Sequence, residues 1–258
     1  MSKHVVLGAR GGTGSQIVKA LLLKSPAVVS HVCAVVRNTS SNAEEWTNND
    51  RVTLVACDVT DPASLDCMTD ADTVYFCCAG KGYDLCQAVD RDGVLNAAQS
   101  SLKYNVRRLV LVSSQLVDPT HNSWNFVRGI LNTINTGLFH RKGMMDFKFA
   151  GENLLRSSGQ AYTIVRPGRL GDGSLDLSKA VIGVGQTNRS YLSNSVVTRE
   201  ALAQVCIDAA LSKHAKNITF EIGTKPPVTD GNDAGLDMFA GFIQDNDRKN
   251  DVETTTCA

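Results

Sequence analysis

The chain has 258 residues, of which 43% are hydrophobic and 20% are charged, and this is the composition of an ordinary globular protein. Its formal net charge is zero, so it lacks the basic surplus of a nucleic-acid-binding protein. No apolar run approaches the roughly 18 residues that a membrane-spanning helix needs, and the start of the chain has no secretory signal pattern. We therefore expect no nucleic-acid partner and no membrane span.

Strand-like and helix-like segments alternate along the chain. The predicted strands are nearly continuous apolar runs, at residues 4–8, 31–37, 51–58, 72–80, 106–114, 161–168 and 217–223. The predicted helices cover residues 12–24, 83–104, 143–158 and 198–211. Strands that are apolar on both faces are typical of a parallel sheet between helices. The alternation predicts an α/β fold, a single doubly wound Rossmann domain at residues 1–244 with a mainly parallel sheet of about seven strands.

Two segments fall outside this alternation. Residues 119–142 are irregular and rich in asparagine, and we predict a lid or a helical insertion there. Its apolar residues have helical spacing and are predicted to pack into the core: Trp124, Phe126, Val127, Ile130, Leu131 and Ile134. An exposed apolar face would instead indicate a partner site. Residues 245–258 are polar and are predicted to form a flexible tail.

The first predicted strand runs into a glycine-rich loop, GARGGTG, that opens the first helix. Gly8, Gly11 and Gly14 have the spacing of a dinucleotide-binding loop in the required strand–loop–helix context. We expect Gly8 to make the tight turn, Gly11 to let a pyrophosphate approach, and Gly14 to let the helix pack on the sheet. Gly12 and Thr13 complete a helix N-terminus whose free N–H groups attract an anion. The alternative is a loop that only makes a turn.

Two arginines bear on the choice of cofactor. Arg37 stands at the end of the second predicted strand, where NAD-selective proteins usually place an acidic residue, and Arg10 lies within the glycine loop. Guanidinium groups beside a ribose suit the 2′-phosphate of NADP(H). We therefore predict NADP(H) as the cofactor. In the alternative interpretation Arg37 is an exposed charge at a strand end.

Further motifs follow in a defined order. They are CDVTDP at 57–62, CCAG at 77–80, VDRDGVLNAA at 89–98, VRRLVLVSS at 106–114 and GENLLRSSGQAYTIVRPGRLGDG at 151–173. Together with GARGGTG, they resemble an atypical short-chain dehydrogenase/reductase of the NmrA-like group, a family of NAD(P)-binding Rossmann proteins. This group includes biliverdin-IXβ/flavin reductases and Tic62-like proteins. The resemblance covers roughly residues 3 to 223.

The resemblance implies roles around the adenosine half of the cofactor. Asp58 and Val59 would flank the adenine, and Ala79 and Gly80 would line the adenosine ribose. Asp58 also precedes an Asp-Pro turn, so a helix-capping role remains the alternative for it.

The resemblance also implies roles around the nicotinamide half. Ser113 and Ser114 would lie beside the nicotinamide as catalytic groups, and Lys148 would bond the nicotinamide ribose and assist catalysis. Pro167 and Gly168 would approach the carboxamide. The residues themselves leave alternatives open, because serines often cap strand ends and a lysine on a helix is often a solvated charge.

One position departs from the family pattern. Family members carry Tyr-x-x-x-Lys with the tyrosine as general acid, whereas Met144 stands four residues before Lys148. A thioether cannot donate a proton, so the acceptor would have to take its proton from water. Flavins, quinones and bilins meet this condition, and we expect an NADPH-dependent reductase of such a planar small molecule. The alternative is a non-catalytic NADP(H) sensor or assembly protein. No sequence feature favours an isomerase or lyase.

The eight cysteines show neither a Cys-x-x-Cys pair nor the Cys/His spacing of a metal site. Several lie in apolar runs, so we expect reduced thiols, no metal, and a reducing compartment such as the cytoplasm or an organelle stroma. Adjacent Cys77 and Cys78 are predicted to point to opposite faces of a strand. We expect a monomer or a weak dimer.

Overall fold

The computed structural model describes residues 2–39, 44–120, 125–137, 140, 142–171, 181–185, 196–225 and 237–247. Its centre is an eight-stranded sheet in the order β3-β2-β1-β4-β5-β6-β10-β8. The strands are β1 (Lys3–Leu7), β2 (His31–Val36), β3 (Val52–Ala56), β4 (Ala71–Phe76), β5 (Arg108–Val112), β6 (Tyr162–Pro167), β8 (Val181–Gly185) and β10 (Ile218–Lys225). All neighbours pair in parallel except β10 and β8, which are antiparallel. The predicted Rossmann sheet of about seven mainly parallel strands is confirmed.

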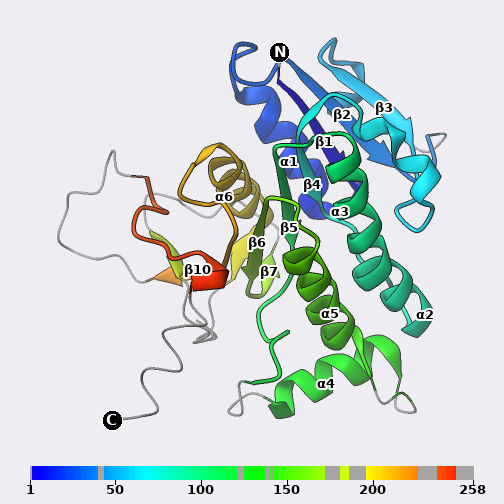
Figure 1. Cartoon of the computed structure of the whole chain (residues 1–258), viewed down its shortest axis with the longest axis vertical. Helices are drawn as coiled ribbons and strands as arrows, with labels where there is room; N and C mark the ends of the chain where they lie inside the picture. Colours follow the sequence, from blue (N-terminus) through cyan, green and yellow to red (C-terminus); the bar gives the residue numbers. More distant parts are fainter. Residues whose placement is uncertain are drawn as a thin grey trace.

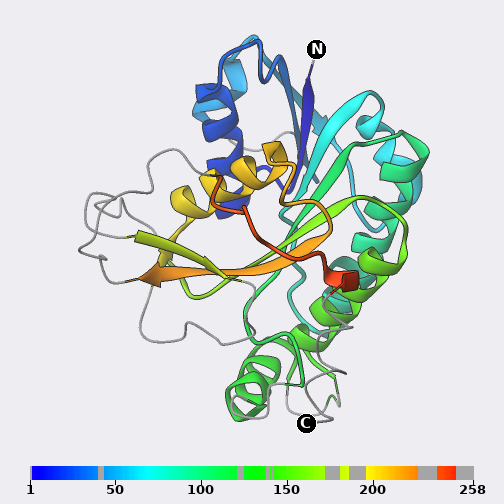
Figure 2. The ribbon, with the colours of Figure 1, turned by 60° about the vertical axis from the view of Figure 1, so that its left-hand side comes forward.

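Helices cover both faces of this sheet (Figure 1 and Figure 2). One face carries α1 (Gly12–Leu23) and α6 (Arg199–Leu211), and their apolar residues share one core with β-strand residues such as Val6. The other carries α3 (Val94–Lys103), α5 (Met144–Ser157) and the 3-10 helix η2 (Pro62–Met68), packed against residues such as Val5. Because neighbours along a strand face opposite sides, Cys77 joins the first core and Cys78 the second, as predicted.

The helix expected over residues 83–104 is divided into three segments. They are α2 (Tyr83–Leu85), the π-helical turns of η3 (Cys86–Gly93) and α3. The wide turns bring the Asp90 carbonyl against Gly151 of α5, where a Cβ would lie 2.1 Å from that oxygen. An apolar pattern does not distinguish π turns from α turns over so short a stretch, so the sequence indicated only a helix.

Shorter elements lie beside the main sheet. A 3-10 helix, η1 (Glu45–Asn48), precedes β3, and β7 (Leu170–Gly171) pairs in parallel with β9 (Val197–Thr198) as a separate two-stranded sheet. Neither β8 nor this small sheet was predicted. Two-residue strands are too short to show any hydrophobic period.

The helical insertion predicted within residues 119–142 is present as α4 (Asn125–Thr136). It packs on the start of α5, where Asp146 accepts hydrogen bonds from Arg128 and from Asn132 (2.7 Å). The prediction of core packing was wrong for three of its residues, because Phe126, Ile130 and Ile134 are 81%, 43% and 74% exposed. Polar contacts hold α4 instead, and they leave one apolar face in solvent. Trp124 lies outside the described residues.

The predicted tail begins with residues that the structure places against the domain. Asp245 accepts hydrogen bonds from the Thr219 amide (2.9 Å) and the Tyr162 hydroxyl (3.0 Å). Residues 248–258 lie outside the described residues. None of the helices described here is both long and apolar enough to cross a membrane.

Candidate functional site

A cleft of about 660 Å³ opens at the carboxyl ends of β1, β2, β3 and β4. This is where the strand order reverses, and ligands of doubly wound sheets bind at such a point. Each strand is followed by a segment that reaches the cleft. Seven of the predicted site residues line it: Gly8, Arg10, Gly11, Arg37, Asp58, Val59 and Ala79.

The glycine loop is built on close backbone contacts. Gly8 has a φ of +82°, a left-handed conformation that side chains disfavour, and its N–H donates to the Val35 carbonyl at 3.1 Å. A Cβ on Gly14 would lie 2.2 Å from the Gly8 oxygen, so only glycine lets α1 begin this near the strand end. A Cβ on Gly11 would meet that oxygen at 3.2 Å, and Gly11 borders the cleft.

The start of α1 does not line the cleft, although it lies beside it. The N–H groups of Gly12, Thr13 and Gly14 donate to no backbone carbonyl among the described residues, and Gly11 provides no side-chain cap. Uncapped N–H groups at the end of a twelve-residue helix attract an anion. Gly12 has a second constraint, because a Cβ there would lie 2.6 Å from Nε of Arg199 in α6.

Two positive side chains and one carboxylate line the part of the cleft beside the ends of β2 and β3. Arg10 donates to the backbone carbonyl of Asn38, just beyond β2, and Arg37 is exposed beside it in the sequence. Asp58 accepts from the amide and hydroxyl of Thr60, at 2.9 and 2.8 Å. These bonds, and to a lesser extent the Arg37 charge, lower the pKa of Asp58. Asp58 therefore stabilises a turn, while η2 is capped by a different residue, Asp61.

A second, much smaller hollow lies next to the cleft and shares Cys78 with it. Ser113, at the end of β5, and Lys148, on α5, both line this hollow. Lys148 Nζ lies 2.7 Å from Oδ1 of Asp90, and the other carboxylate oxygen accepts from the Gly80 amide at 3.0 Å. The lysine is thus neither a solvated helix charge nor an isolated group, because it is held by a buried carboxylate.

The remaining predicted residues are spread over the carboxyl end of the sheet. Gly80 is buried, and its Cβ would collide with the Leu85 carbonyl at 2.1 Å. Pro167 ends β6, and Gly168 follows it beside the Gln115 side chain. Ser114 follows Ser113 but lines neither hollow described here. The structure therefore gathers the adenosine-side residues into one cleft and leaves the nicotinamide-side residues in separate places around it.

The sequence analysis did not predict the buried ion pair between Glu152 of α5 and Arg166 of β6. Glu152 is fully buried in α5, and Arg166 of β6 donates to both of its oxygens, at 3.0 and 2.6 Å. Burial opposes ionisation of Glu152, but the charges of Arg166 and Arg156 outweigh it and lower the pKa of Glu152. A charged residue inside the apolar strand run AYTIVRPG was the available signal, since a buried charge needs a partner.

Asp90 was also missed as a site residue. It is 1% exposed and connects Lys148 to the Gly80 backbone, so it fixes one side of the small hollow. The available sequence signal was an aspartate within the VDRDG motif of the predicted helix at residues 83–104. Among the described residues, no group of three or more His, Cys, Asp or Glu side chains is arranged to hold a metal ion.

Comparison with known proteins identifies the family. A model described as NAD(P)H-binding matches residues 8–213. The chain belongs to this family. Its fold is the Rossmann fold that the motifs predicted.

Individual relatives are distant. The chain is 29% identical over 226 residues to an uncharacterised chloroplastic protein of Arabidopsis thaliana, covering 85% of this chain and 76% of that one. It is 27% identical over 141 residues to the sanguinarine reductase of Eschscholzia californica, covering 54% and 46%. Among solved structures, a short-chain dehydrogenase/reductase of Veillonella parvula in complex with NADP has a TM-score of 0.65 at 18% identity, covering 91% and 99%. At this low identity, the similarity to the Veillonella parvula structure shows only a shared fold.

Proposed function

We propose that this protein is an NADPH-dependent reductase of a planar small molecule of the flavin, quinone or bilin type. Membership of the NAD(P)H-binding family and the similarity to a plant reductase support a nicotinamide-dependent reductase. The single observation that carries the finer proposal is the position of Met144. It opens α5 one turn before Lys148, where a tyrosine would act as general acid.

The residues of the cleft fit a dinucleotide. Gly11 leaves space at the cleft wall, and the uncapped N–H groups at the start of α1 suit a pyrophosphate. Asp58 and Val59 line the part of the cleft where we place the adenine, with Ala79 beside the adenosine ribose. Arg10 and Arg37 supply positive charge, and the described end of β2 carries no carboxylate, which favours the 2′-phosphate of NADPH. When bound, NADPH supplies a hydride.

The chain's own polar groups would orient the acceptor. The Ser113 hydroxyl is buried near the Glu152 carboxylate, whose pKa it helps to lower, and it lines the small hollow through which a ligand group would approach. Lys148 lies at the same hollow and is fixed by Asp90. Among the described residues no tyrosine lines the cleft or the hollow. A planar acceptor that takes its proton from water needs only this positioning.

Turnover tests this proposal. Purified protein is mixed with NADPH and, in separate assays, with FMN, a benzoquinone, biliverdin and a simple aliphatic ketone, and loss of the reduced nicotinamide is followed by absorbance. We expect oxidation with at least one planar acceptor and none with the ketone. The variant Ser113→Ala should lower kcat with that acceptor while leaving NADPH affinity unchanged. Activity with the ketone alone would contradict the proposal.

A second candidate function has one observation in its favour. The exposed residues Phe126, Ile130 and Ile134 form an apolar stripe on α4, and such a surface on a dinucleotide-binding domain suits an assembly partner. The protein would then bind NADP(H) without turnover, either as a sensor of the cofactor or to control docking of a partner on this stripe. Tight NADPH binding with no oxidation by any planar acceptor would favour this function over the reductase.

A further inference from the structure

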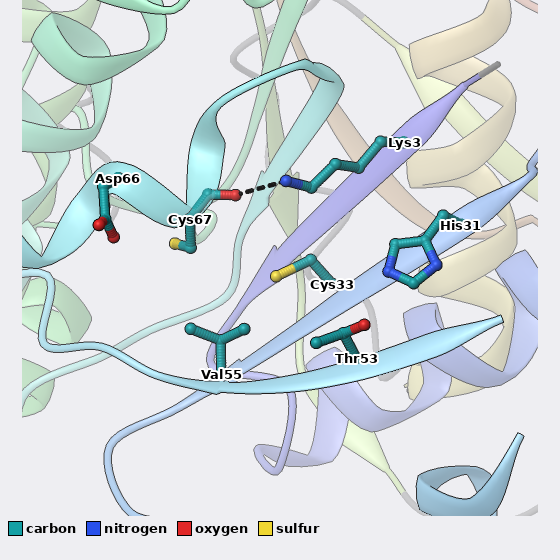
Figure 3. Close-up of a pocket in the computed structure, with 7 residues that line it drawn as sticks. All are labelled: Lys3, His31, Cys33, Thr53, Val55, Asp66 and Cys67. Atoms are coloured by element: carbon teal, nitrogen blue, oxygen red, sulfur yellow. Dashed lines mark hydrogen bonds between the residues drawn. The ribbon is translucent and has the colours of Figure 1, made fainter. Parts of the chain in front are cut away.

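A second pocket, of about 360 Å³, lies away from the cofactor cleft on the sheet face that carries η2 (Figure 3). Its wall contains two cysteines, Cys33 from β2 and Cys67 from η2. Its other lining residues are Lys3, His31, Thr53, Val55 and Asp66, and none of the seven also lines the cofactor cleft. The proposed reductase function makes no use of this pocket.

The two thiols line the same pocket and interact with each other. Figure 3 shows the Cys33 and Cys67 side chains on neighbouring elements, with Lys3 beside them. Lys3 Nζ donates to the carbonyls of Cys67 (2.9 Å) and Thr69 (2.8 Å), so it ties β1 to η2 at this point. Both thiols are free, and the backbone segments that carry them are held in place around a space that a small molecule can enter.

The electrostatics of the pair are asymmetric. The neighbouring Cys67 thiol stabilises the thiolate of Cys33, and together with Lys3 it lowers the pKa of Cys33 despite burial. The same hydrogen-bonding contact with Cys33 raises the pKa of the Cys67 thiol to about 12. Cys33 is therefore the first of the two to ionise, and Cys67 keeps its proton. His31 and Asp66 are the other titratable groups that line the pocket. A lowered pKa is the property that makes a thiol nucleophilic at neutral pH.

We propose that Cys33 and Cys67 form an oxidisable dithiol that reacts with small hydroperoxides entering this pocket. The Cys33 thiolate attacks the outer oxygen of the hydroperoxide, the O–O bond breaks, and a proton from solvent converts the leaving oxygen to an alcohol or to water. Cys33 is then a sulfenic acid. The Cys67 sulfur attacks it, the S–O bond breaks, and water leaves with the Cys67 proton. In sum, one hydroperoxide is reduced by two electrons and two thiols become one disulfide.

Cys57 is the nearest competitor for this chemistry. It is a neighbour of Cys67, but it lines the cofactor cleft instead of the pocket. Its Sγ also lies 3.2 Å from Ser64 Oγ, and its pKa is raised by Cys67 and by burial. Cys57 therefore opens to a different cavity and has a raised pKa where Cys33 has a lowered one, and the predicted disulfide joins Cys33 to Cys67.

Peptide mapping of the wild-type chain is the test. The purified, fully reduced protein is exposed to a small excess of hydrogen peroxide, its intact mass is measured, and its free thiols are then blocked for digestion. We expect a loss of about 2 Da before blocking, for one disulfide. Trypsin releases Cys33 in peptide 25–37 and Cys67 in peptide 52–81, and cleavage before aspartates then isolates Cys67 in residues 66–69. A linkage between 25–37 and 66–69 is the predicted product.

Variants assign the order of events. Cys67→Ser should stop the reaction at Cys33 sulfenic acid, which dimedone traps with a gain of mass on peptide 25–37. Cys33→Ser should slow peroxide-dependent thiol loss by at least about tenfold. Cys206→Ser, at a thiol buried in α6, is the matched control and should react like wild type. The proposal is overturned if wild type forms no 25–37 to 66–69 linkage, or if Cys33 is oxidised no faster than Cys206. Neither readout requires the cofactor or turnover, so the outcome is independent of the reductase assay.

Discussion

Lys148 Nζ lies 2.7 Å from Oδ1 of Asp90, and this ion pair joins α5 to the wide turns of η3 beside the cofactor cleft. The side chains are 12% and 1% exposed. The second Asp90 oxygen holds the Gly80 amide, so the pair also fixes the loop that follows β4. A positively charged group proposed to contact the cofactor is therefore positioned by an almost fully buried carboxylate.

This arrangement predicts a strong stability coupling. Lys148→Met leaves the Asp90 carboxylate buried without its cation and should lower the free energy of unfolding by about 3 kcal/mol. Asp90→Asn in the same background should recover part of the loss, because it removes the uncompensated charge. Urea unfolding of both single variants and of the double variant gives the coupling energy. The partly exposed pair Arg91 and Asp92 is the control, with a coupling below about 1 kcal/mol. Additive losses for Lys148 and Asp90 would contradict this interpretation.

Arg37 should determine cofactor choice. Arg37→Ala removes a charge that we place beside the 2′-phosphate, so the Kd for NADPH should rise by about 10- to 100-fold while the Kd for NADH changes by less than about threefold. Fluorescence titration of both cofactors measures this. Lys213→Ala, which removes an exposed positive charge beyond the far end of α6, should leave both constants unchanged. An equal rise in the Kd of both cofactors would show that Arg37 contacts a part of the dinucleotide that NADPH and NADH share.

Substitutions at two glycines of the loop should have different effects, on cofactor binding at Gly11 and on folding stability at Gly14. Gly11→Val places a side chain at the cleft wall, and we expect it to weaken NADPH binding by at least about 30-fold with the fold retained. Gly14→Ala forces a Cβ to within 2.2 Å of the Gly8 oxygen and should lower thermal stability markedly. Calorimetry and circular dichroism of both variants distinguish the two effects. Retained NADPH affinity in a folded Gly11→Val protein would refute the assignment of the pyrophosphate to this loop.

The titration of His4 should account for part of the loss of folding stability at acid pH. It is fully buried in β1, with Nδ1 3.3 Å from the Tyr75 hydroxyl, and burial lowers its pKa from 6.5 to about 4. Since the unfolded chain takes up a proton that the folded chain refuses, stability falls as the pH drops from about 6.5 toward 4. This costs roughly 3 kcal/mol at the acid end. His4→Gln should show a shallower decline in urea unfolding between pH 7 and pH 4.5, and parallel curves would refute the role of His4.

The fold was readable from the sequence, and so was the gathering of predicted residues at the carboxyl ends of β1 to β4. Apolar runs identify the strands because both faces of a parallel sheet are buried, and each strand of the switch point carries its site residue just after its end. The ion pairs were not readable. Asp90 and Lys148 are 58 positions apart, and Glu152 and Arg166 meet only because α5 packs on β6. Which charged side chains pair with each other depends on tertiary packing. The exposure of Phe126 and Ile134 depends on it too, because an amphipathic pattern shows that a helix has an apolar face but not whether another element covers that face.

The most direct test of the central claim is a calorimetric titration of the purified protein with NADPH and, separately, with NADH. The cleft with Arg10 and Arg37, and with no carboxylate on the described end of β2, predicts one site per chain and NADPH affinity at least about tenfold higher than NADH affinity. Equal affinity for the two cofactors, or no binding of either, would contradict the account.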